Sequence, residues 1–160
     1  WLEVPLVSGK TETRSLPELP DASFTGASLR ILMADDAAAN RELVTAILTP
    51  LGVMVETVEN GLQACSAVAM GGYDMVLMDV HMPVMDGLEA ARSIRRSEGL
   101  SSMVPIVALT ANVGSDQIEQ TRLAGMNAHV AKPINVSELI GCIGHLIAMT
   151  DEPAPQELAG

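Results

Sequence analysis

One stretch decides the fold, the segment from Tyr73 to Gly87, which reads YDMVLMDVHMPVMDG. It is apolar on four successive residues, Met75 to Met78, and this run ends in Asp79. A short continuous apolar run is typical of a strand that is covered on both faces. A proline and a glycine mark the second half as a shaped loop, and Asp86 can cap the helix that follows. The stretch therefore predicts a buried strand, a loop and the start of a helix.

The same unit recurs along the chain on both sides of this stretch. Apolar runs of strand length occupy residues 29–34, 53–58, 75–78, 104–109 and 128–131. Apolar residues at helical spacing follow each run, most clearly at 136–147 and least clearly at about 114–125. Five strand–helix units with right-handed crossovers predict an α/β fold, (βα)5, in which helices cover both faces of a parallel five-stranded sheet.

The regions outside these units differ in composition. Residues 8–28 are rich in proline, glycine, serine and threonine without periodicity, which predicts a linker. Residues 149–160 are acidic and hold two prolines, which predicts a flexible tail. The domain itself is therefore expected at 29–148.

The charge balance excludes some functions. The chain of 160 residues has 20 acidic and 9 basic residues, a formal charge of −11. Binding to nucleic acid or to an anionic membrane needs clustered lysine and arginine, so we expect neither. No run approaches the ~20 apolar residues of a membrane span, so we expect a cytoplasmic location and no direct membrane contact by this part of any longer parent chain. The two cysteines lie far apart, and no Cys/His pair has zinc spacing.

Polar side chains end four of the five apolar runs. Asp35 and Asp36 follow the first run, Asp79 the third, Thr110 the fourth and Lys132 the fifth. The carboxyl ends of parallel strands meet at one edge of the sheet, where ligands bind. Three close carboxylates stay ionised only beside a cation, and oxygen ligands suit Mg²⁺, with Mn²⁺ as a second candidate. Because a carboxylate can also attack phosphorus, the set predicts metal-assisted phosphoryl transfer.

Each of these residues also has a simpler interpretation. Capping the first helix could be the sole role of Asp36, although Asn40 is also placed to cap it. Thr110 could be a turn residue and Lys132 a solvated strand end. The coincidence of four polar strand ends favours a shared site.

The loop after Asp79 holds residues of the kind that bind a different metal. His81, Met82 and Met85 are ligand types for a soft copper ion. The proline and glycine around them favour a shaped loop instead.

Residues 73–87 resemble the phospho-acceptor signature of two-component receiver domains. The acidic pair, the sequence LTAN at 109–112 and the sequence AKPI at 131–134 agree with this family. The similarity covers residues 29–148. It implies a flavodoxin-like receiver fold with sheet order 2-1-3-4-5, in which Asp79 accepts a phosphoryl group from a phosphohistidine.

The resemblance also implies a metal site. Asp36 and Asp79 would bind Mg²⁺ directly, together with the backbone carbonyl of His81, and Asp35 would act mostly through water. The chain departs from many relatives at Ala37, where they carry asparagine.

The remaining roles that the resemblance implies concern the phosphoryl group and switching. Thr110 would grip the phosphoryl oxygens and Lys132 would pair with them, from a loop with a cis Lys-Pro bond. His81 and Asn112 would flank the phosphoryl group. His129 stands where the family has an aromatic switch residue, so Thr110 and His129 are the candidate switch pair.

The first residues suggest a larger context. Residues 1–7, WLEVPLV, resemble the last strand of the ATP-binding domain of histidine kinases, although an arbitrary strand or a vector remnant would read similarly. A kinase end, a linker and a receiver is the order in hybrid sensor histidine kinases. The implied partners are a histidine-kinase core, a histidine-phosphotransfer protein, or both. The fragment would phosphorylate and dephosphorylate itself, and the transferase activity would belong to its parent chain.

Two other functions stay open. A pseudo-receiver would dock to partners without phosphorylation, which the intact set of polar strand ends argues against. A haloacid-dehalogenase-type phosphatase also uses a strand-end aspartate, but that family has a second aspartate two residues on, where this chain has His81.

Overall fold

A computed structural model describes residues 28–150, and the structural statements below concern that part of the chain. The interpretation of residues 1–7 as a kinase end lies outside the described residues, and so do all but residue 28 of the expected linker at 8–28 and all but residues 149 and 150 of the expected tail at 149–160.

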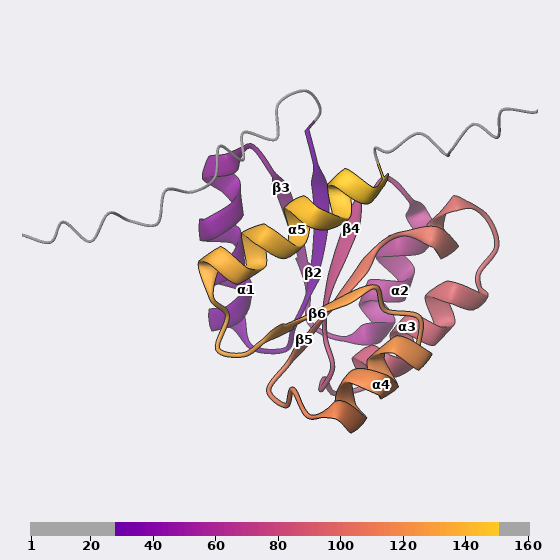
Figure 1. Cartoon of the computed structure of the whole chain (residues 1–160). Helices are drawn as coiled ribbons and strands as arrows, with labels where there is room; N and C mark the ends of the chain where they lie inside the picture. The colour runs from indigo at the N-terminus through magenta and orange to yellow at the C-terminus, as the bar shows by residue number, and fades with distance from the viewer. Residues whose placement is uncertain (1–27, 151–160) are drawn as a thin grey trace, which may run out of the picture.

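Five parallel strands form one sheet (Figure 1). They are β2 (Arg30–Ala34), β3 (Met54–Val58), β4 (Met75–Asp79), β5 (Ile106–Thr110) and β6 (Ala128–Ala131). Their spatial order is β3-β2-β4-β5-β6, which is 2-1-3-4-5 when the strands are counted from β2. The predicted α/β fold and its strand order are confirmed.

Five helices connect and follow the strands. They are α1 (Ala38–Leu48), α2 (Gly61–Met70), α3 (Gly87–Arg96), α4 (Ser115–Leu123) and α5 (Val136–Thr150), with 3₁₀ turns η1 (Thr49–Leu51) and η2 (Leu100–Met103). α5 continues two residues past the expected domain end at 148. The Asp86 side chain accepts a hydrogen bond from the backbone N–H of Glu89 at 2.8 Å, which confirms the predicted cap of α3. None of these described helices is long and apolar enough to cross a bilayer.

The helices form two layers around the sheet. α1 and α5 cover one face, and α2, α3 and α4 cover the other (Figure 1). Successive residues of β2 point to opposite faces, so Ile31 packs with Val44 of α1, whereas Leu32 packs with Ala64 of α2. This arrangement explains why each central strand holds an uninterrupted run of four apolar residues.

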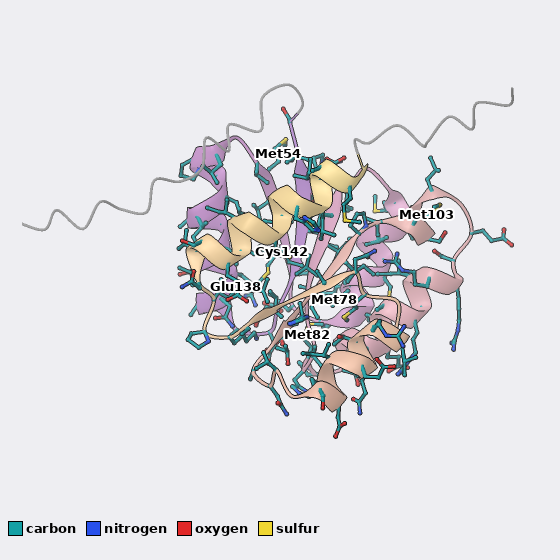
Figure 2. All side chains as sticks on the ribbon, in the orientation of Figure 1. Met54, Met78, Met82, Met103, Glu138 and Cys142 are labelled. Atoms are coloured by element: carbon teal, nitrogen blue, oxygen red, sulfur yellow. The ribbon has the colours of Figure 1, made fainter. Side chains whose placement is uncertain are left out.

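The carboxyl ends of the strands share one end of the sheet. Met54, at the start of β3, and Met82, just after β4, lie at opposite ends of the molecule (Figure 2). The polar residues that follow the strands are therefore gathered at the end marked by Met82.

Candidate functional site

Three carboxylates meet where β2 and β4 end. Asp35 is fully buried, Asp79 is 4% exposed and Asp36 is exposed. The register that pairs Ala34 with Met78 brings the two strand ends side by side. Each aspartate places one oxygen within 4.8 Å of the others. The structure therefore joins the three acids that were expected to lie together.

Lys132 neutralises part of this charge. Its ammonium lies 3.0 Å from Asp35 Oδ2 and 3.1 Å from Asp79 Oδ1. The backbone N–H of Lys132 donates to the carbonyl of Thr110 at 2.8 Å, which continues the ladder between β5 and β6 beyond the strand. The Lys132–Pro133 bond is cis, as the resemblance implied. One cation thus bridges the two buried carboxylates.

The surroundings of Asp79 disfavour its charged form. Burial is the largest effect and raises the pKa of Asp79, Lys132 lowers it through a hydrogen bond, and the charge of Asp35 raises it again. The net shift is upward. Burial alone would lower the pKa of Lys132, but its contacts with Asp35 and Asp79 outweigh burial and raise it, so the lysine stays charged.

This shift predicts a pH-dependent stability in metal-free protein. A carboxyl whose pKa is higher in the folded than in the unfolded state lowers the free energy of unfolding as the pH rises from about 4 through the raised pKa. Asp79→Asn should therefore raise the midpoint of thermal unfolding by several degrees at pH 7 in EDTA. The difference from wild type should shrink toward zero near pH 4. A less stable variant at pH 7 would contradict this prediction.

Thr110 is buried, and its hydroxyl is hydrogen-bonded to the backbone of Asn112. Its hydroxyl donates to the carbonyl of Asn112 at 2.8 Å and accepts from the backbone N–H of Asn112 at 3.1 Å. The Asn112 side chain accepts a hydrogen bond from Gly114 N–H at 2.9 Å, next to the first residue of α4. Asn112 therefore links Thr110 to the start of α4.

The two histidines of interest have exposed side chains. His81 touches the site through its backbone N–H, which donates to Asp79 Oδ1 at 3.2 Å. His129 lies on β6 opposite Ala108 of β5 and is exposed in this structure.

The methionines that follow His81 take part in apolar packing. Met82 and Met85 contact the cluster under α2 and α3, and the sulfur of Met85 lies 3.8 Å from the thiol of Cys65. This packing accounts for both methionines without a copper ion.

Sequence reasoning missed two residues that contact Asp35. The Asn40 side-chain amide donates to Asp35 Oδ2 at 3.0 Å, and the Arg41 guanidinium donates to the Asp35 backbone carbonyl at 2.7 Å. Ala37 is the N-cap of α1 and makes no side-chain cap bond, so neither Asp36 nor Asn40 caps this helix. The apolar stripe of α1 starts only at Leu43 and gave no signal for these contacts. The helix begins earlier, at Ala38, and its first turn directs both residues back toward the strand end.

The donor set fits a hard divalent cation. All three candidate ligands are carboxylates, as Mg²⁺ prefers, and a single lysine only partly offsets their charge. Asp36 makes no hydrogen bond or ion pair with another described residue, so both of its oxygens are available to an ion.

Comparison with known proteins identifies the family. The family model for the response regulator receiver domain matches residues 31–143. The chain belongs to this family. The chain is 41% identical over 112 residues to the sensor protein GacS of Pseudomonas syringae pv. syringae, and the match covers 69% of this chain and 12% of that protein. It is 32% identical over 162 residues to the probable histidine kinase 1 of Oryza sativa subsp. indica, covering 82% of the chain and 17% of the kinase. The receiver thus spans less than a fifth of the length of these relatives.

Solved receiver structures agree with the fold. The receiver domain of sensor histidine kinase PA1611 from Pseudomonas aeruginosa, with a magnesium ion coordinated in its active-site cleft, is 38% identical with a TM-score of 0.70, covering 76% of this chain and 99% of that domain. One chain matches in the co-crystal structure of the Saccharomyces cerevisiae histidine phosphotransfer protein Ypd1 with the receiver domain of its response regulator Ssk1. That chain is 27% identical with a TM-score of 0.71, and the match covers 77% of this chain and 91% of that chain.

Proposed function

We propose that this receiver accepts a phosphoryl group from a phosphohistidine on Asp79 in a Mg²⁺-dependent reaction, as one step of a phosphorelay. The observation that carries the proposal is the bridge between Lys132 and the two buried carboxylates Asp35 and Asp79, beside an exposed Asp36. This arrangement supplies a nucleophile, a cation for the phosphoryl oxygens and ligands for a metal.

The chain's own residues divide the work. Lys132 and the His81 N–H hold Oδ1 of Asp79, which leaves Oδ2 to attack phosphorus. The attack forms the Oδ2–P bond as the bond from phosphorus to the donor histidine nitrogen breaks, and that nitrogen keeps the electron pair. Lys132 then pairs with a phosphoryl oxygen. The Thr110 hydroxyl gives up its hydrogen bond to the Asn112 carbonyl and donates to another phosphoryl oxygen instead. Movement of Thr110 would disturb Asn112 and hence the start of α4, while His129 is the second candidate switch residue.

Magnesium has a defined place in this proposal. Asp36 and Asp79 would hold it directly with the His81 carbonyl, and Asp35 would act through water. When bound, it neutralises charge on the phosphoryl oxygens, and Mn²⁺ can serve in the same place. The magnesium in the related PA1611 receiver supports this assignment.

The proposed context is a hybrid histidine kinase in the cytoplasm. The relatives include sensor kinases, and the chain spans only a small share of their length. Its partners would be the kinase core of such a protein, a histidine-phosphotransfer protein, or both. The solved complex of a receiver with a phosphotransfer protein supports the second partner.

The deciding experiment is phosphorylation of the 160-residue chain by acetyl phosphate. Intact-mass analysis with Mg²⁺ should show one added phosphoryl group that hydroxylamine removes, as expected of an acyl phosphate. EDTA should abolish the adduct because the acidic cluster then repels the donor. Absence of any adduct with Mg²⁺ would overturn the proposal and favour a docking module that works without phosphorylation.

A further inference from the structure

The carboxylate of Asp35 is held at both oxygens. Oδ1 accepts the backbone N–H of Ala37 at 2.8 Å, and Oδ2 accepts the Asn40 amide and the Lys132 ammonium, each at 3.0 Å. Asp35 is fully buried, so the loss of one of its hydrogen-bond donors costs free energy that water does not restore. Its orientation is therefore set by these three donors.

Of the three donors, Asn40 is the one that serves Asp35 alone through its side chain. Lys132 is shared with Asp79, whose Oδ1 lies 3.1 Å from the same ammonium. The backbone N–H of Ala37 holds the other oxygen and cannot fix the rotation of the carboxylate by itself. Without Asn40, Lys132 would be the one remaining donor to Asp35 Oδ2, and this would draw its ammonium away from Asp79.

Arg41 confines the effect of such a loss to one side chain. It donates to the backbone carbonyl of Asp35 at 2.7 Å, so the main chain at the end of β2 stays in place when the amide of residue 40 is removed. Asn40 is also in the first turn of α1, where alanine is a better helix former than asparagine. A variant at this position should therefore fold.

We propose that Asn40 is a positioning residue for the metal site. Its amide orients the Asp35 carboxylate toward the common position that Asp36 and Asp79 also face, and it keeps Lys132 available to Asp79. The inference rests on the proposed function only for the identity of the cation. Residues that orient metal-binding groups typically change metal affinity by about 10- to 100-fold when they are removed.

The test measures Mg²⁺ binding to the 160-residue chain by titration calorimetry, without a phosphodonor. Asn40→Ala and Asn40→Leu should each bind Mg²⁺ about 10-fold more weakly than wild type. The matched control is Asn60→Ala, which removes the cap bond that the Asn60 side chain accepts from the backbone N–H of Gln63 in α2. This variant should have lower stability but a Mg²⁺ affinity within about 2-fold of wild type. Urea unfolding of every variant measures stability separately.

A double-mutant cycle tests whether Asn40 acts through Asp35. In an Asp35→Asn background, adding Asn40→Ala should change Mg²⁺ affinity little, because the carboxylate that it orients is gone. Wild-type affinity in both Asn40 variants, an equal loss in Asn60→Ala, or full additivity with Asp35→Asn would each overturn the inference. A chain that binds Mg²⁺ in this pattern but forms no adduct with acetyl phosphate would refute the proposed function and leave the role of Asn40 standing.

Discussion

Asp79→Asn should reduce the phosphoryl adduct from acetyl phosphate and Mg²⁺ to background. An amide cannot attack phosphorus as a carboxylate does, and asparagine has nearly the shape of aspartate, so the buried position at the end of β4 stays filled. The loss would therefore report the missing nucleophile and not an unfolded chain. Intact-mass analysis measures the adduct, and thermal unfolding in EDTA confirms that the variant is folded.

The same variant decides which of the three clustered carboxylates takes the phosphoryl group. Asp35 is engaged at both oxygens, so its nucleophilic capacity is already committed to hydrogen bonds. Asp36 is exposed and is the one realistic rival. Asp36→Asn should still form the adduct when the Mg²⁺ concentration is raised, because it weakens the metal site but keeps Asp79. A full adduct on Asp79→Asn would move the acceptor to Asp36.

The fold could be predicted from the sequence because both faces of the sheet are covered. Leu32 and Met33 of β2 belong to opposite layers, and the same alternation in β4 and β5 makes each central strand an uninterrupted apolar run. The edge strand β3 exposes Met54 and Glu56, yet the apolar run at 53–58 still predicted it. The site followed from topology, because parallel strands bring their carboxyl ends together.

The sequence could not predict the residue at which a helix begins or the backbone conformation inside a loop. The apolar stripe of α1 starts at Leu43, but the helix begins at Ala38, and only that earlier start turns Asn40 toward Asp35. Val84 adopts a left-handed backbone with φ of 70°, which a β-branched residue rarely does. Nothing in its identity signals that conformation, which is imposed by the loop between β4 and α3.

Close backbone approach was equally hidden, and it makes Gly87 the position where a single methyl group should do most damage. Gly87 is the first residue of α3 and donates its N–H to the carbonyl of Val80 at 2.9 Å. A Cβ at this position would overlap the backbone oxygen of Asp79, because it would lie far closer than non-bonded carbon and oxygen atoms approach. The helix or the end of β4 must therefore move.

Gly87→Ala should lower the free energy of unfolding by about 3 kcal/mol, the upper end of the usual cost of overpacking. It should also slow phosphorylation, because the displaced backbone is that of Asp79, the proposed acceptor. The matched control is Gly141→Ala in α5, where an added Cβ meets no atom within 4 Å. That variant should be about 0.5–1 kcal/mol more stable than wild type, since alanine restricts the unfolded chain and favours helix. Urea unfolding in EDTA measures both changes, and the acetyl phosphate reaction measures the rates. Equal stability of the two variants would mean that α3 can shift away from β4 without cost, and the tight contact between Gly87 and Asp79 would then not be what fixes Asp79 in place.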